Sequence, residues 1–147
     1  MGRRLVTLVS VAVIAAAPTA AQAAAPGHGA TKVHLQVHAF GSCSTGPEGG
    51  EPAGGFAIIH ATGSGKAVAV LSLKRLTPKH TYDVALVQTP SGTDCFTPDA
   101  TVRTNARGNG TVNIQERLRR GTTGVFLLVQ PSDENGFIHS TPLVPVH

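Results

Sequence analysis

The sequence has little of what many enzymes and redox proteins require. Its 147 residues include no tryptophan, one methionine and only two cysteines, and 14% of them are charged. The cysteines are far apart, so the close Cys-x-x-Cys spacing of a reactive or metal-binding thiol pair is absent. No Gly-x-Ser-x-Gly elbow occurs, and a hydrolase would have to assemble its serine, histidine and acid from distant loops. We therefore predict a protein that is not an enzyme and needs no cofactor.

The charge pattern lacks the footprint of a nucleic-acid-binding protein. The formal net charge is +4, and two of these charges, Arg3 and Arg4, lie in a segment that we expect to be removed. In the rest of the chain the basic cluster is Arg117, Arg119 and Arg120. Such a short run is typical of a solvated strand end rather than of a phosphate-binding face. No nucleic-acid partner is predicted.

The first 23 residues have the pattern of a cleavable signal peptide. Arg3 and Arg4 form a basic start, an apolar run covers Leu5 to Ala17, and Ala21-Gln22-Ala23 is a small-x-small cleavage site. We predict cleavage after Ala23 and a single secreted, extracellular domain of residues 24–147. The apolar run is shorter than the ~20 residues of a membrane span, and no later segment comes closer, so no membrane span is predicted. The alanine-rich signal is typical of bacteria.

Export to an oxidising compartment favours a disulfide between Cys43 and Cys95. Two cysteines allow only one pairing. In the chain-entropy description, closing a loop of this length stabilises the fold by about 4 kcal/mol.

Hydrophobic alternation with period two predicts an all-β protein. No segment shows a helical period, and a long glycine-rich loop is expected from Gly41 to Gly55. The last strand should be an edge strand, because Pro142 and Pro145 cannot donate to a ladder. Short strands joined by turns indicate a sandwich or barrel. The expected strands cover residues 33–39, 56–61, 67–73, 82–86, 100–104, 112–115, 125–130 and 138–146.

One run of sequence resembles a known class of fold. Leu76, Pro78 and Tyr82 stand in Leu-Thr-Pro-Lys-His-Thr-Tyr-Asp-Val, which is similar to the Leu-x-Pro-x-x-x-Tyr-x-Val run of fibronectin type III and related immunoglobulin-like domains. The resemblance implies a tyrosine corner, in which Tyr82 bonds the backbone upstream. The same stretch, with Cys95 and the 102–112 hairpin, also looks like the neocarzinostatin-type apoproteins, which sequester a small ligand. The expected fold is an immunoglobulin-like antiparallel β-sandwich of about seven to eight strands.

The disulfide would tie two loops together at one end of this sandwich. Loops on a rigid β scaffold are where such domains bind partners. The first functional hypothesis is a non-catalytic secreted binding or cell-envelope accessory domain for a protein, a glycan or a small apolar ligand. The structural alternative is that both loops are mobile connectors. The candidate binding residues are Ser44, Glu48, Glu51, Ser91, Thr93 and Phe96.

Three histidines suggest the alternative of an extracellular copper- or zinc-binding protein. His34 and His38 point to one side of the first strand, and His60 could join them from the next. Side chains four apart on a strand are about 13 Å apart, however, so the first two cannot share one metal ion without a bulge. We interpret these histidines as exposed groups on a solvated face, and no metal site is predicted.

Overall fold

The computed structural model describes residues 29–37, 41–93 and 95–146, and within these it is all-β, as expected. The proposed signal peptide lies outside the described residues. Nine strands follow one another without a helix between them in the described part of the chain. They are β1 (Thr31–Val37), β2 (Glu51–Thr62), β3 (Lys66–Leu73), β4 (Thr81–Thr89), β5 (Ala100–Arg103), β6 (Gly110–Arg117), β7 (Gly124–Pro131), β8 (His139–Ser140) and β9 (Val144–Pro145).

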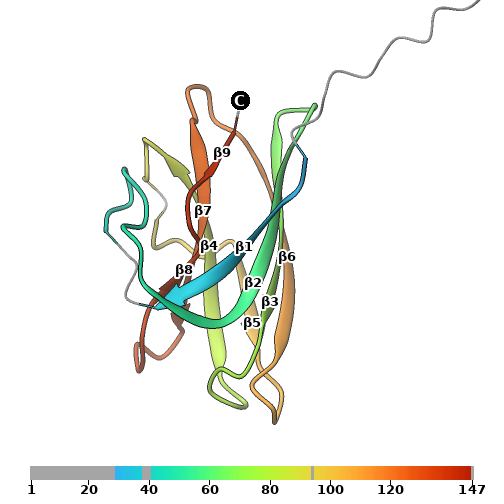
Figure 1. Cartoon of the computed structure of the whole chain (residues 1–147), viewed down its shortest axis with the longest axis vertical. Helices are drawn as coiled ribbons and strands as arrows, with labels where there is room; N and C mark the ends of the chain where they lie inside the picture. Colours follow the sequence, from blue (N-terminus) through green and yellow to red (C-terminus); the bar gives the residue numbers. More distant parts are fainter. Residues whose placement is uncertain (1–28, 38–40, 94, 147) are drawn as a thin grey trace, which may run out of the picture.

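The strands form one antiparallel sheet that is nearly closed on itself. Its order is β5-β4-β7-β8-β1-β2-β3-β6, and β9 pairs with β7. The two ends of this path, β5 and β6, are consecutive in the chain and lie side by side without a ladder between them. Figure 1 shows β4 and β7 on one side of the molecule and β2, β3 and β6 on the other. The line along which β4 and β5 face β6 is called the seam below.

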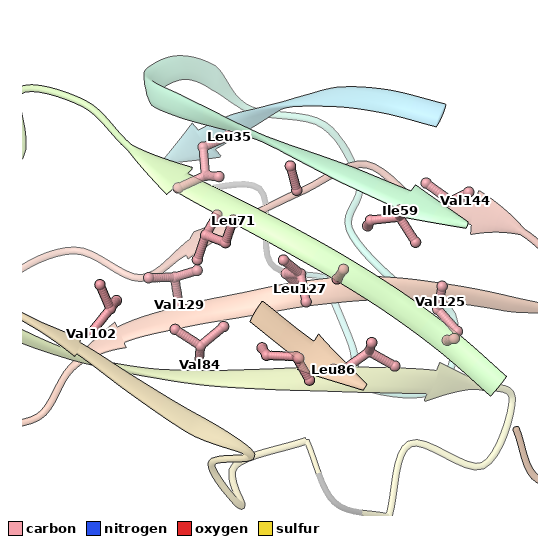
Figure 2. Close-up of a cluster of buried hydrophobic side chains, with 14 of the residues drawn as sticks. Leu35, Ile59, Leu71, Val84, Leu86, Val102, Val125, Leu127, Val129 and Val144 are labelled. Atoms are coloured by element: carbon pink, nitrogen blue, oxygen red, sulfur yellow. The ribbon is translucent and has the colours of Figure 1, made fainter. Parts of the chain in front are cut away.

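The main core fills the space between these two sides. Alternate residues of each strand point inward, so Leu35 and Ile59 meet Val84 and Leu127 across the interior (Figure 2). Each of these four side chains is fully buried. Burying a side chain of this size contributes about 1.5–3 kcal/mol relative to leaving it in water, so this interior is the principal source of stability.

A second, smaller apolar cluster lies on the outer surface of β4 and β7. Ala85 and Val87 of β4 and Phe126 and Leu128 of β7 are buried there with Cys95, and Cys43 and Ile138 pack against them. β7 is therefore apolar on both faces, and it pairs with β4, β8 and β9. The expectation that residues 125–130 form a central strand is confirmed.

The expected loop from Gly41 to Gly55 was drawn too long, because β2 begins at Glu51. Gly54 and Gly55 lie inside β2, at the point where its backbone comes very close to the chain at the end of β3. A Cβ on Gly54 would collide with the carbonyl oxygen of Lys74, whose N–H donates to Gly54 O at 3.1 Å. These glycines permit close backbone approach rather than forming a turn.

The expected edge strand over residues 138–146 is also wrong. It divides into β8 and β9, separated by Pro142, and β8 lies in the middle of the sheet between β7 and β1. Ser140 is aligned with Gln36 on one side and Leu128 on the other. Proline does not interrupt the central ladder, because the two residues that pair in it, His139 and Ser140, both carry an N–H.

No helix in the described ranges is long and apolar enough to cross a membrane.

Candidate functional site

The predicted disulfide is present and joins two loops over the outer surface of β4 and β7. Cys43 and Cys95 have Cα atoms 5.6 Å apart and are separated by 52 residues of sequence. The loops also meet at Gly92, which has φ +55°, and a Cβ there would collide with the backbone of Cys43. The bond therefore holds residues 41–50 together with residues 90–93 and 95–99 above the second apolar cluster.

The candidate residues of the first loop lie on its surface. Ser44 is exposed, and its Oγ is 3.3 Å from Ser42 Oγ. Glu48 is exposed as well, and its side chain covers Gly41. Glu51 is the first residue of β2, opposite Val37, rather than part of the loop. These residues are accessible, and they are not gathered around a common cavity among those described below.

Ser91 and Thr93 of the second loop are hydrogen-bonded to Arg119. The Nη1 atom of Arg119 donates to Thr93 Oγ1 at 2.8 Å and to Ser91 Oγ at 3.3 Å. Ser91 Oγ also donates to Gln88 O at 3.4 Å. Arg119 thus ties the loop to the segment before β7, and both hydroxyls serve to hold the loop in place.

Phe96 is an exposed aromatic residue next to a buried cysteine. Its side chain is 56% exposed, whereas the adjacent Cys95 is 3% exposed. A second aromatic residue, Phe137, is 62% exposed in the segment between β7 and β8. Sequence reasoning missed Phe137, because nothing in the sequence shows that this segment folds beside the second loop.

Two adjoining hollows lie beside Phe96 and the chain around Phe137. A shallow one is lined by Phe96, Pro98 and Leu128, and a deeper one of about 310 Å³ is lined by Ser132, Glu134 and Gly136. Asp83 and Gln130 line both hollows. Ser132 Oγ donates to Asp83 Oδ1 at 2.7 Å. The two hollows and the exposed Phe137, whose chain neighbours Gly136 and Ile138 line the deeper hollow, are called the Phe96–Phe137 face. Its other residues are Asp83, Phe96, Gln130, Ser132 and Glu134.

Tyr82 makes the upstream backbone contact of a tyrosine corner. Its hydroxyl accepts a hydrogen bond from the N–H of Thr77 at 3.3 Å. Leu76 packs against the main core, and Pro78 is exposed in the turn. The ring of His80 meets the Tyr82 ring edge to face, with centroids 5.1 Å apart. This arrangement fixes the turn before β4 and has a structural role.

The strand register keeps the described histidines apart. His34 on β1 is aligned with Phe56, four residues from His60 on β2, a separation of about 13 Å. His38 lies outside the described residues. Within the described ranges no group of three His, Cys, Asp or Glu side chains could hold a metal ion.

The seam holds a polar network that sequence reasoning did not find. Gln88 Nε2 donates to Glu116 Oε2 and to Arg117 O, each at 3.1 Å, and Gln88 Oε1 accepts from Arg119 N at 2.8 Å and Thr122 Oγ1 at 2.9 Å. All hydrogen-bonding positions of the Gln88 amide are therefore used. The sequence does contain a signal for Glu116. The alternation of Val112 and Ile114, extended by two residues, places Glu116 on the inward side of the strand.

Glu116 shares this seam with the carboxyl of Asp99. Partial burial raises the pKa of Glu116 to about 7, and a hydrogen bond to the Asp99 carboxyl adds to the rise. Asp99 Oδ2 also accepts from Leu86 N at 2.6 Å, which extends the β4–β5 pairing by one bond. Neither Glu116 nor Asp99 lines the two hollows of the Phe96–Phe137 face. The pair fits a strand-joining role better than acid–base catalysis.

In comparisons with known proteins, no family model, curated protein or solved structure matches the chain. The immunoglobulin-like resemblance of residues 76–84 therefore stays a prediction.

Proposed function

We propose that the chain is a non-catalytic, exported binding domain of the cell envelope or its surroundings, and that it binds a glycan on the Phe96–Phe137 face. The observation that carries the proposal is the way in which the disulfide presents Phe96. Cys95 is fixed in the second apolar cluster, so the neighbouring ring is held outward on a rigid support. An aromatic residue that is already in place loses little side-chain entropy when a ligand binds.

The chemistry of this face favours a glycan over the other ligands considered. The two hollows of this face offer carboxylates from Asp83 and Glu134 and an amide from Gln130. Aromatic faces carry negative charge density that attracts polarised C–H groups, and carboxylate and amide groups pair with hydroxyls. A small apolar ligand would instead favour a pocket lined mainly by apolar groups, with few polar ones.

Three features support the wider setting. The basic and apolar start of the sequence has the signal-peptide pattern. A disulfide is compatible with an extracellular protein, since such bonds persist in oxidising compartments. The Tyr82 corner and the antiparallel all-β architecture support an immunoglobulin-like sandwich as the fold type.

Co-sedimentation with insoluble polysaccharides tests the proposal. Purified protein is mixed with peptidoglycan, chitin or cellulose, and the bound fraction is measured. At least one of these glycans should retain the protein. Phe96→Ala and Phe137→Ala should each weaken retention about tenfold, because exposed aromatic anchors carry much of a binding surface's affinity.

Phe56→Ala is the matched control. Phe56 lies on β2 with Lys32 Nζ 4.3 Å from its ring centroid, away from the proposed face. This variant should bind within twofold of the parent. If the parent binds none of the three glycans, or if Phe96→Ala and Phe137→Ala bind as well as the parent, the glycan proposal is wrong.

A further inference from the structure

A separate hollow lies where the turn between β3 and β4 meets the segment after β7. Its volume is about 350 Å³, and it is lined by Lys79, His80, Thr81, Arg103, Ser132 and Asp133. Three of these six side chains can carry positive charge. They come from two places in the sequence: Lys79 and His80 from the turn before β4, and Arg103 from the end of β5.

The charges in this hollow do not cancel. His80 Nε2 is 3.2 Å from Asp133 Oδ1, so a protonated His80 and Asp133 neutralise each other. The N–H of Asn135 donates to the same carboxylate at 3.1 Å and, with His80, lowers the pKa of Asp133. Lys79 and Arg103 have no ion pair with any residue in the described ranges. The lining therefore has an excess of positive charge: one with His80 neutral and two with His80 protonated.

The backbone holds these groups in position. Lys79 has φ +54°, an uncommon conformation for a residue with a side chain, and its N–H donates to Asn105 O at 3.1 Å. The N–H of His80 donates to Thr104 Oγ1 at 3.0 Å, and the N–H of Thr104 returns a bond to His80 O at 2.9 Å. The cationic side chains are thus mounted on two segments that are bonded to each other.

We propose that this hollow binds a tetrahedral oxyanion group, a phosphate or a sulfate. The excess of positive charge favours an anion, and the planar guanidinium of Arg103 suits two parallel bonds to its oxygens. Arg103 is aligned directly with Thr81 across the β4–β5 ladder, so the Thr81 hydroxyl can supply a further donor. The Ser132 hydroxyl already donates to Asp83, which lines the adjoining Phe96–Phe137 face and not this hollow.

This site does not depend on the glycan proposal, and its test uses no neutral glycan. Inorganic phosphate and inorganic sulfate are titrated separately into isotopically labelled protein at pH 6 and constant ionic strength. Backbone amide shifts are followed by NMR. We expect saturable shifts centred on Lys79, His80 and Arg103. Shifts that are absent, or that are spread evenly over the surface without saturation, would overturn the proposal.

Variants test whether the surplus charge is responsible. Lys79→Gln and Arg103→Gln should each weaken binding about tenfold, because each removes one charge-assisted contact. Arg107→Gln makes the same charge change in the nearby β5–β6 turn and should bind within twofold of the parent. Equal weakening by all three variants would show a general charge effect and overturn the site. Both Lys79 and Arg103 are exposed, and a thermal melt of each variant checks that folding is retained.

A comparison of dextran sulfate with inorganic sulfate identifies the source of the group. Tighter binding of the polymer, lost in Arg103→Gln, would indicate an anionic group carried on a macromolecule. Equal affinity per sulfate group would indicate a free ion. Binding of the polymer that is unchanged in both Lys79→Gln and Arg103→Gln would contradict the site.

Discussion

The amide Nε2 of Gln88 lies 3.1 Å from Oε2 of Glu116, and this bond joins β4 to β6 where the two strands share no backbone ladder. The nearly closed sheet is therefore fastened at the seam by side chains. Gln88 is 3% exposed, so replacing it would leave several partly buried groups without their partner.

Gln88→Met should lower the free energy of unfolding by about 2–4 kcal/mol, because Glu116 and the N–H of Arg119 lose their hydrogen bonds. Urea denaturation measures the change. Gln115→Met makes the same substitution on the exposed outer face of β6 and should stay within about 0.5 kcal/mol of the parent. Equal stability of the two variants would contradict the role of Gln88 at the seam.

The domain should lose stability as the pH rises through 7. Because the folded-state pKa of Glu116 is raised from 4.5 to about 7, the folded protein binds more protons than the unfolded chain in this interval. The stabilising contribution is complete below pH 4.5 and disappears as Glu116 ionises. After allowing for exposure, we expect a loss of about 1 kcal/mol between pH 5 and 8, or roughly 3–6 °C in Tm.

Glu116→Gln should remove this pH dependence, since an amide at position 116 carries no charge at either pH. Thermal melts at pH 5 and pH 8 provide the comparison. Glu48→Gln, in the exposed first loop, should keep the dependence of the parent. A pH profile that is the same in Glu116→Gln and the parent would show that another group is responsible.

Replacing both cysteines, as Cys43→Ser with Cys95→Ser, should lower the free energy of unfolding by about 4 kcal/mol, given the 52-residue separation. The same variant should free the loops over β4 and β7, so amide exchange at residues 91–93 should become faster. Residues 68–72 of β3, in the main core, should exchange as slowly relative to the other core strands as they do in the parent. Unchanged exchange at residues 91–93 would show that the second apolar cluster holds the loops without the bond.

Gly54→Ala should destabilise the domain by more than about 2 kcal/mol, because its Cβ would meet the Lys74 carbonyl and the strands would have to separate. Gly63→Ala is the control, since nothing lies within 4 Å of a Cβ at that turn position. Chemical denaturation of both variants tests the close approach. Similar stabilities for the two would show that β2 tolerates a wider spacing.

The sequence predicts most of the strands because their alternation is local, but it cannot show how distant segments pair. Alternation over residues 82–86 and apolar content over 125–130 identified β4 and β7, and the two cysteines allowed one bond. Gly54 was misread because a glycine in a strand and a glycine in a turn look alike until the neighbouring backbone is known. Phe96 could be chosen from its position in the tied loop. Phe137 could not, since tertiary packing decides that its neighbours Gly136 and Ile138 line the same hollow as Asp83 and Gln130.

The position of β8 affects how the chain can mature. Residues 139 and 140 are the link between β7 and β1 in the sheet, so a chain synthesised only as far as β7 has two groups of strands with no ladder joining them. The ribosome must release residues 139 and 140 before β7 and β1 can be joined, so the sheet stays incomplete until this segment has been synthesised.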